Sequence, residues 1–186
     1  LIEGGQTMNP STEDMLKAIE RVNAENIFIL PNNKNIIMAA QQARDLTEDK
    51  NIIVIPSRTV PQGITALVNF MPDLGPEENT RTMTEEMGNV RTAQITYAVR
   101  TTNIDGIDEG DIMALGDHGI LAVGKSVDGV ALEAMKEMLD DESELVTIYY
   151  GADVSEHEAK VLEEQAQEQY PDKEIELQYG GQPIYY

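Results

Sequence analysis

The two ends of this 186-residue chain repeat one pattern of helix and short apolar strand. In the first third, apolar runs at residues 27–30 and 51–55 each end at a proline, and each follows a stretch with helical spacing of apolar residues. In the last third, runs at 145–150 and 174–178 stand in the same order, again after helical stretches. Short strands without polar alternation, separated by helices, are typical of a parallel sheet covered on both faces. The sequence therefore predicts an internally duplicated α/β fold.

The two copies align through their turns. Pro31 pairs with Gly151 at an offset of 120 residues, and Asp49 pairs with Asp172 at an offset of 123, so the second copy carries three extra residues. Helices are expected at residues 12–23, 36–46, 78–87, 130–139 and 155–169. Ser11 with Asp14, and Ser155 with Glu158, have the spacing of a capping box at a helix start.

The middle of the chain has a different pattern. Residues 91–101 alternate between apolar and polar, which predicts a strand with one wet face. Two apolar runs flank Gly116-Asp117-His118-Gly119, which predicts a hairpin. We therefore expect a mixed, largely parallel fold with helices on both faces and an antiparallel insertion. Its segments would be residues 1–75, 76–125 and 126–186, together forming one compact domain.

The charge of the chain excludes several partners. Thirteen Lys and Arg against 34 Asp and Glu give a net charge of −21, so nucleic acid is not an expected ligand. An anionic membrane surface is disfavoured for the same reason. The absence of cysteine, of a signal peptide and of a long apolar run favours the cytoplasm. A first residue other than Met suggests a piece of a longer protein.

No self-sufficient catalytic or metal motif stands out. His118 and His157 are the two histidines, and their spacing matches no zinc site; we expect one at a hairpin tip and the other exposed on a first helical turn. Gly4 and Gly5 precede a helix start, where a tight turn is favoured over an anion cradle because no lysine accompanies them. A binding or assembly role is therefore favoured over catalysis.

Polar and basic side chains follow the first two predicted strands at the point where each ends. Because the carboxyl ends of neighbouring parallel strands meet at one edge of a sheet, we expect these side chains to lie together, where open α/β sheets bind ligands. The candidates for contact with a partner or ligand are Asn32, Asn33, Lys34, Ser57, Arg58 and Gln62. Turn-forming amides are also common in ordinary loops, so a purely structural role is the competing interpretation.

Several long strings of residues resemble one protein family. They lie at residues 3–14, 29–36, 55–64, 97–100 and 180–186. These strings are similar to the C-terminal region of the ATP-binding subunit of bacterial fatty acid kinase, which belongs with dihydroxyacetone kinase-like proteins. The resemblance covers nearly the whole chain and is far more specific than any short motif.

The resemblance implies a three-part parent. An N-terminal domain would bind ATP and magnesium, and a middle domain would support catalysis and form a homodimer. A C-terminal domain of DegV-like architecture would engage a DegV-like carrier, whose bound fatty acid becomes an acyl phosphate for phospholipid synthesis. Nothing here matches the family's nucleotide site, so no catalytic, cofactor or metal residue is assigned. No activity is expected from this chain alone.

Two functions of different classes follow. The first is a non-catalytic domain that docks the fatty-acid-carrying partner, with the acidic surface complementing a basic face. The alternative is a domain with its own small-ligand site, for a fatty acid or a phosphorylated ligand, at the edge formed by residues 32–34 and 57–62. A free-standing enzyme ranks last, since no base or metal site is evident.

Overall fold

The computed structural model describes residues 2, 9–101 and 106–186, which form two compact units, Leu1–Val90 and Arg91–Tyr186. The first unit contains α1 (Thr12–Arg21), β1 (Asn26–Ile29), α2 (Lys34–Leu46), β2 (Asn51–Val54), α3 (Val60–Val68) and α4 (Pro76–Met87). The second contains β3 (Gln94–Tyr97), β4 (Ile112–Gly116), β5 (Gly119–Gly124), α5 (Val127–Met138), β6 (Leu145–Tyr150), α6 (Glu156–Gln169) and β7 (Glu174–Tyr179). None of the helices in these ranges is long and apolar enough to cross a membrane.

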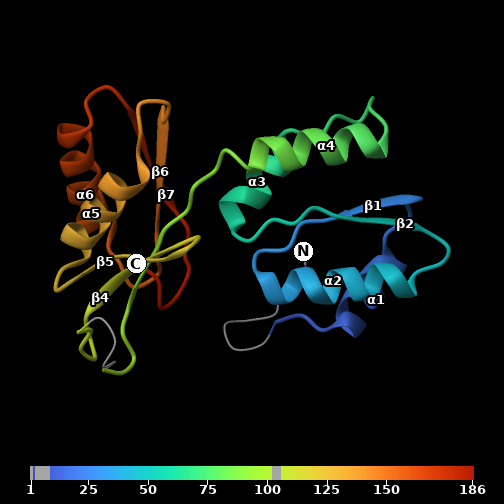
Figure 1. Ribbon diagram of the computed structural model, residues 1–186, viewed down its shortest axis with the longest axis horizontal. Coiled ribbons are helices and arrows are strands. Elements are labelled where there is room, and N and C mark those ends of the chain that lie inside the picture. The colour runs from blue at the N-terminus through green and yellow to red at the C-terminus, as the bar shows by residue number, and fades with distance from the viewer. Residues whose placement is uncertain (1, 3–8, 102–105) are drawn as a thin grey trace. The chain divides into compact units, whose positions relative to one another are not determined.

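The first unit is a three-layer arrangement around two parallel strands. Strands β1 and β2 pair in parallel, with Ile27 opposite Ile52. Because side chains alternate along a strand, each strand supplies apolar groups to both faces. Helices α1 and α2 cover one face, and α4 with Ala66 of α3 covers the other (Figure 1). This confirms helices on both faces of a parallel sheet.

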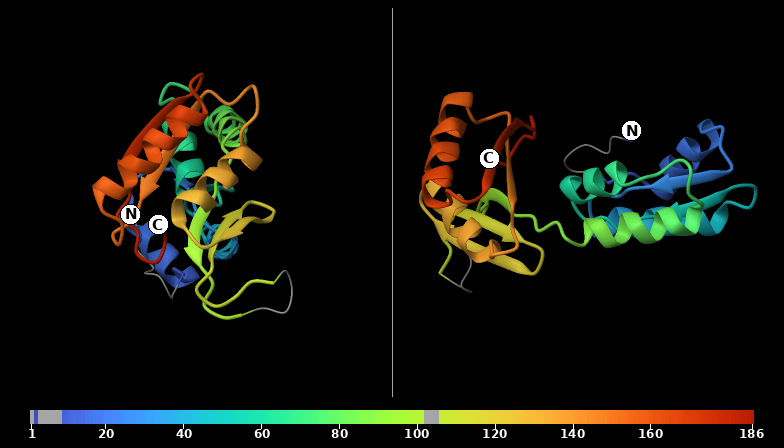
Figure 2. Two further views of the ribbon diagram at one scale, coloured as in Figure 1. Left: turned by 90° about the vertical axis from the view of Figure 1, so that its left-hand side faces the viewer. Right: turned by 90° about the horizontal axis from the view of Figure 1, so that it is seen from above.

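The second unit combines an antiparallel and a parallel sheet. Strands β3, β4 and β5 form the antiparallel sheet in that order, and α5 packs on it through Val130 and Ala134 (Figures 1 and 2). Asp117 and His118 form the two-residue turn between β4 and β5, as the sequence predicts. Strands β6 and β7 pair in parallel beside α6. The mixed fold with an antiparallel insertion is therefore confirmed.

A lysine tether occurs at the same place in both halves. Lys50 and Lys173 each stand just before the second strand of their pair, and each ammonium group donates to two backbone carbonyls near the end of the helix that precedes the first strand. The acceptors are Ile19 and Val22 for Lys50, at 2.8 and 2.7 Å, and Asp140 and Ser143 for Lys173, at 3.0 and 2.9 Å. The acceptors for Lys50 lie at the last turn of α1, and those for Lys173 lie in the turn after α5, so each lysine ties the end of a helix to the start of a strand. The repeated tether is structural support for the duplication.

Helix α3 is the main feature that the sequence patterns did not predict. The sequence patterns assign no helix between residues 46 and 78, but Thr59 caps a helix that begins at Val60 and carries Pro61 in its first turn. Proline is favoured there because its missing N–H would have no partner anyway. Strand β3 is also shorter than the predicted 91–101, and ends at Tyr97.

The three-segment division of the chain stays a prediction. Its middle segment, residues 76–125, contributes α4 to the first unit and β3 to β5 to the second. Both capping boxes are confirmed: Ser11 and Asp14 cap α1, and Ser155 and Glu158 cap α6.

A buried asparagine fixes the turn between α3 and α4. The Asn79 side chain, 1% exposed, accepts a hydrogen bond from the Met71 amide at 2.8 Å. Its amide group donates to the carbonyls of Met71 at 2.9 Å and Leu74 at 3.0 Å, with Gly75 at 3.3 Å. Without this side chain, the Met71 amide and the Leu74 carbonyl would lose these hydrogen-bond partners. Asn79 therefore sets the orientation of α3 relative to α4.

Candidate functional site

The carboxyl ends of β1 and β2 meet at one edge, as the sequence predicts. Ser57, which is fully buried, donates from its hydroxyl to the Pro31 carbonyl at 2.5 Å. This bond joins the segment after β1 to the segment after β2. The six candidate residues therefore lie at this edge, four on the two loops and Lys34 and Gln62 in the first turns of α2 and α3, although their role in binding stays a prediction.

The asparagines of this edge serve the start of α2. Asn33 is the N-cap, and its side-chain oxygen accepts from the amides of Asn35 and Ile36 at 3.0 and 3.1 Å. Its side-chain nitrogen donates to the oxygens of Asn9 at 3.0 Å and Asn32 at 3.4 Å. Capping satisfies helix amides that have no partner within the helix. Most of the hydrogen-bonding capacity of Asn33 is thus used by the fold itself.

Gln62 has a comparable local role at the start of α3. Its side-chain oxygen accepts from the Arg58 amide at 2.9 Å, and its side-chain nitrogen donates to the Val90 carbonyl at 3.4 Å. The Gln62 amide in turn donates to the Thr59 hydroxyl at 3.4 Å. The side chain therefore holds the loop that connects β2 to α3.

Lys34 and Arg58 are the two candidates whose charged groups take no part in this framework. Both residues are exposed, and within the part of the chain that the structure describes neither charged group forms a hydrogen bond or ion pair. Lys34 begins α2, so its charge adds to the positive end of that helix dipole. This edge therefore carries local positive charge on a chain with a net charge of −21.

The corresponding edge of the second half is covered by the C-terminal segment. The Ala152 amide donates to the Gln182 carbonyl at 2.9 Å, and the Gln182 side chain donates to the Tyr149 carbonyl at 2.9 Å. A Cβ atom added to Gly151 would lie 2.0 Å from the Tyr185 carbonyl oxygen, so only glycine permits this approach. Of the two edges, the first is the one with exposed cationic side chains.

A surface hollow of about 440 Å³ lies at the other end of α2. It is lined by Leu16, Ile19, Glu20, Leu46, Thr47, Glu48, Asp49 and Lys50. Since α2 runs from Lys34 to Leu46, the hollow and the candidate edge are separated by about 18 Å along the helix. The hollow does not belong to the predicted site.

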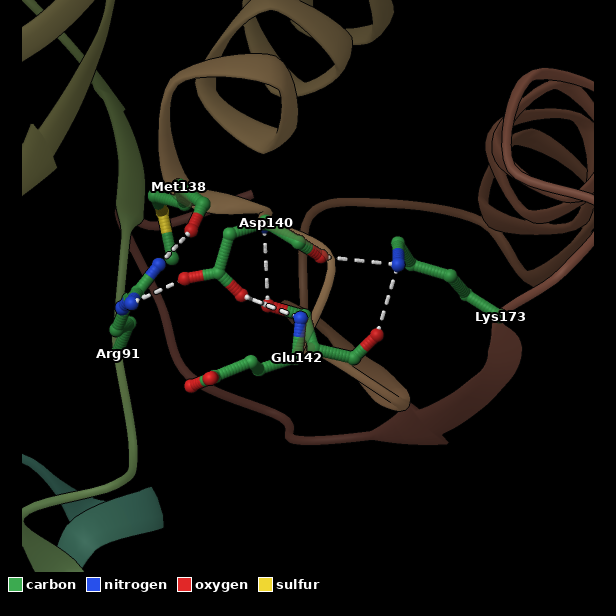
Figure 3. A network of polar contacts seen from close by, with 6 residues as sticks. Arg91, Met138, Asp140, Glu142 and Lys173 are labelled. Atoms are coloured by element: carbon green, nitrogen blue, oxygen red, sulfur yellow. Dashed lines mark hydrogen bonds and ion pairs between the residues drawn. The ribbon is translucent and has the colours of Figure 1, made fainter.

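The charged cluster around Asp140 stabilises a turn (Figure 3). Asp140 accepts from Ser143 at 2.8 Å and pairs with Arg91 at 2.5 Å, while Lys173 closes the same turn. The Ser143 hydrogen bond, followed by the Arg91 contact, holds the pKa of Asp140 below its usual value. Arg91 also donates to the Met138 carbonyl at 2.5 Å. All these groups are used by the turn, so the cluster is structural.

The other chemistry-bearing residues do not converge. His118 lies at the hairpin tip and His157 is exposed in the first turn of α6, as predicted. Among the described residues, no group of His, Asp and Glu could hold a metal ion, and every buried polar side-chain atom has a hydrogen-bond partner. Gly4 and Gly5 lie outside the described residues.

Comparison with known proteins identifies the family. Residues 1–186 match the family of C-terminal domains of FakA-like fatty acid kinase proteins. The chain belongs to this FakA-like family. Among curated relatives, protein YloV of Bacillus subtilis is 46% identical over 187 residues, and protein SAR1202 of Staphylococcus aureus is 42% identical over the same length. The match covers all of this chain but 34% of each relative, so this FakA-like chain spans about a third of their length.

Solved structures of low sequence identity share the fold of this FakA-like chain. Streptococcus pneumoniae fatty acid kinase B3 protein, solved loaded with linoleic acid, has a TM-score of 0.63 at 17% identity, over 95% of this chain and 70% of that one. The DegV family protein Cg2579 of Corynebacterium glutamicum has a TM-score of 0.65 at 14% identity, over 90% and 74%. The predicted DegV-like architecture is therefore confirmed.

The sequence patterns missed the outward face of α3. Val60, Ile64, Leu67 and Val68 are between 43% and 78% exposed. The available signal was Thr59 as a helix cap, Pro61 shortly after it, and apolar residues three and four apart. Helical spacing alone assigns such a stripe to the core, so its exposure was not predictable.

Proposed function

We propose that this chain is the part of a fatty acid kinase that docks a separate carrier protein of the DegV fold. The carrier would hold a fatty acid, and the rest of the kinase would use ATP and magnesium to phosphorylate its carboxylate to an acyl phosphate. The match of the family over residues 1–186 carries this proposal. The B3 protein of Streptococcus pneumoniae, loaded with linoleic acid, illustrates the kind of carrier.

The electrostatics of the chain support docking. A net charge of −21 produces a negative surface that attracts a basic partner and raises the association rate. The polar residues at the β1 and β2 edge mainly bond to each other and to the backbone, which fits a scaffold for contacts more readily than a preformed small-molecule pocket.

Calorimetric titration of the 186-residue chain with a lipid-loaded DegV-fold carrier from the same organism tests this function. We expect micromolar or tighter binding that weakens as salt rises from about 50 to 300 mM, because screening shortens the range of charge attraction. The absence of heat and of co-elution at both salt concentrations would refute docking by this chain.

A second candidate function is supported by the two exposed cations at the edge. Lys34 and Arg58 could contact the carboxylate of a fatty acid or a phosphate group. A lipid that co-purifies with the chain and is lost in Lys34→Met and Arg58→Met would favour this function over docking.

A further inference from the structure

Helix α3 packs on the protein through small residues and exposes its large aliphatic ones, which is the reverse of an ordinary surface helix. The residues that face the protein interior are small: Ala66 is fully buried, and a Cβ on Gly63 would lie 3.8 Å from the Ser57 hydroxyl. The large aliphatic residues face outward instead, although surface helices normally bury them. The fold therefore places small residues at the core contact and keeps the larger apolar groups available.

The exposed residues form one stripe, which we call the α3 apolar face. It consists of Val60 (57% exposed), Ile64 (43%), Leu67 (61%), Val68 (78%) and Met71 (51%). At 100° per residue the four residues of α3 itself fall within about 100° of one another around the helix axis, and Met71 follows just beyond the end of the helix. Contiguous apolar patches of this kind mark interaction surfaces on soluble domains.

The α3 apolar face lies in an uncharged stretch beside an acidic border. Residues 59–72 contain no charged side chain, although a quarter of the whole chain is charged. Asp73, Glu77 and Glu78 follow directly and are exposed, and no ion pair involves them among the described residues. The bonds of Asn79 to the Met71 backbone bring the start of α4 next to the end of the stripe.

We infer that the α3 apolar face, with the acidic border formed by Asp73, Glu77 and Glu78, is the surface that docks the carrier. This inference rests on the proposed function and names the surface that performs it. The partner chemistry that fits is an apolar contact area bordered by lysine or arginine, the arrangement of an apolar core and polar rim that interfaces commonly have. A second copy of this chain fits less well, because two chains of charge −21 repel each other.

The surface is also held ready for binding. Asn79 fixes the turn between α3 and α4, and Phe70 packs edge-on against Phe28 of β1 with 5.5 Å between ring centres. Little ordering is therefore required when a partner binds, which lowers the entropic cost of association.

The test compares two leucine substitutions of the same chemistry in the same unit. Leu67→Asp alters the α3 apolar face, whereas Leu46→Asp alters a leucine of similar exposure, 65%, at the end of α2. Affinity for a lipid-loaded DegV-fold carrier is measured by calorimetry, with circular dichroism as a check of folding. We expect Leu67→Asp to weaken binding by at least about tenfold, and Leu46→Asp to change it less than about twofold. Val68→Asp is the second variant on the face, at 78% exposure.

The border is tested separately with Glu78→Lys, which should slow association and reduce its dependence on salt. If both Leu67→Asp and Val68→Asp bind the carrier with wild-type affinity, the inference is overturned and the proposed function stands. An equal loss of affinity in Leu46→Asp would also overturn the inference. So would a Leu67→Asp variant that loses thermal stability and keeps its affinity, or a wild-type dimer that dissociates in Leu67→Asp. No binding by the wild-type chain would overturn both.

Discussion

Substitution of Asn79 by leucine should destabilise the first unit by about 3 kcal/mol. The side-chain amide of Asn79 has one acceptor oxygen and two donor hydrogens, so the substitution removes three hydrogen bonds. The Gly75 carbonyl, at 3.3 Å, is not counted separately because it shares a donor hydrogen with the nearer carbonyls of Met71 and Leu74. At about 1 kcal/mol for each hydrogen bond, the sum is about 3 kcal/mol. Leucine has the same branched arrangement of four side-chain heavy atoms as asparagine and is not smaller, so the substitution leaves no cavity.

Urea titration followed by far-ultraviolet circular dichroism measures this effect. With an m-value of about 1.5–2 kcal/mol per M, the midpoint of the first unit should fall by roughly 1.5–2 M. All seven tyrosines lie in the second unit, so tyrosine fluorescence provides an internal control whose midpoint should move less. Asn89→Leu, at an exposed position after α4, should change stability by less than about 0.5 kcal/mol.

A companion variant refines the reasoning. Asn79→Asp keeps the acceptor that serves the Met71 amide but loses both donors and buries a carboxyl group among carbonyl oxygens. Burial raises the folded-state pKa of such a carboxyl, so its destabilising effect should diminish as pH falls. If Asn79→Leu lowers the free energy of unfolding by less than about 1 kcal/mol, or by the same amount as Asn89→Leu, then Asn79 does not hold the turn.

Three further predictions concern the second unit. Lys173→Met keeps the apolar stem but removes the hydrogen bonds to two carbonyls, and should lower the free energy of unfolding by about 2 kcal/mol, as measured by tyrosine fluorescence. Lys160→Met, at an exposed ion pair, is the control and should have little effect. Gly151→Ala should displace the C-terminal segment and make it more susceptible to proteolysis, and Gly75→Ala, with open space around its Cβ position, should not. Asp140→Asn should destabilise the unit at pH 7, and its difference from wild type should narrow below pH 3.8, because Asp140 contributes stability only while ionised and its folded pKa is lowered. A difference that is independent of pH would contradict the role given to the Asp140 carboxylate.

Most of the framework could be predicted from local sequence signals. The apolar strands, the serine caps of α1 and α6, and the hairpin around Asp117 and His118 depend on residues close in sequence. The offset of 123 residues that pairs Asp49 with Asp172 also pairs Lys50 with Lys173, and these two lysines make equivalent contacts. Such features are predictable because their stabilising interactions lie within a few residues or follow from strand order.

The candidate site was only partly predictable. The edge formed by Ser57 and Pro31 follows from the parallel order of β1 and β2, so the sequence located it correctly. Whether its side chains were free or engaged depended on partners distant in sequence, such as Asn9 for Asn33 and Val90 for Gln62. Distances of 24 and 28 residues along the chain lie outside any local pattern.

By itself, the sequence determined the duplicated helix–strand order, the caps and the net charge of −21, because these depend on composition and short-range spacing. Tertiary structure alone decided which side of α3 faces outward and where the C-terminal segment returns. The apolar stripe of α3 has the spacing of a core helix, and only the close packing of Gly63 and Ala66 against the strands turns Leu67 and Val68 away from the core. Likewise, Tyr186 reaches the Ile95 carbonyl at 3.0 Å across 91 residues of sequence, a contact that exists only after both sheets have formed.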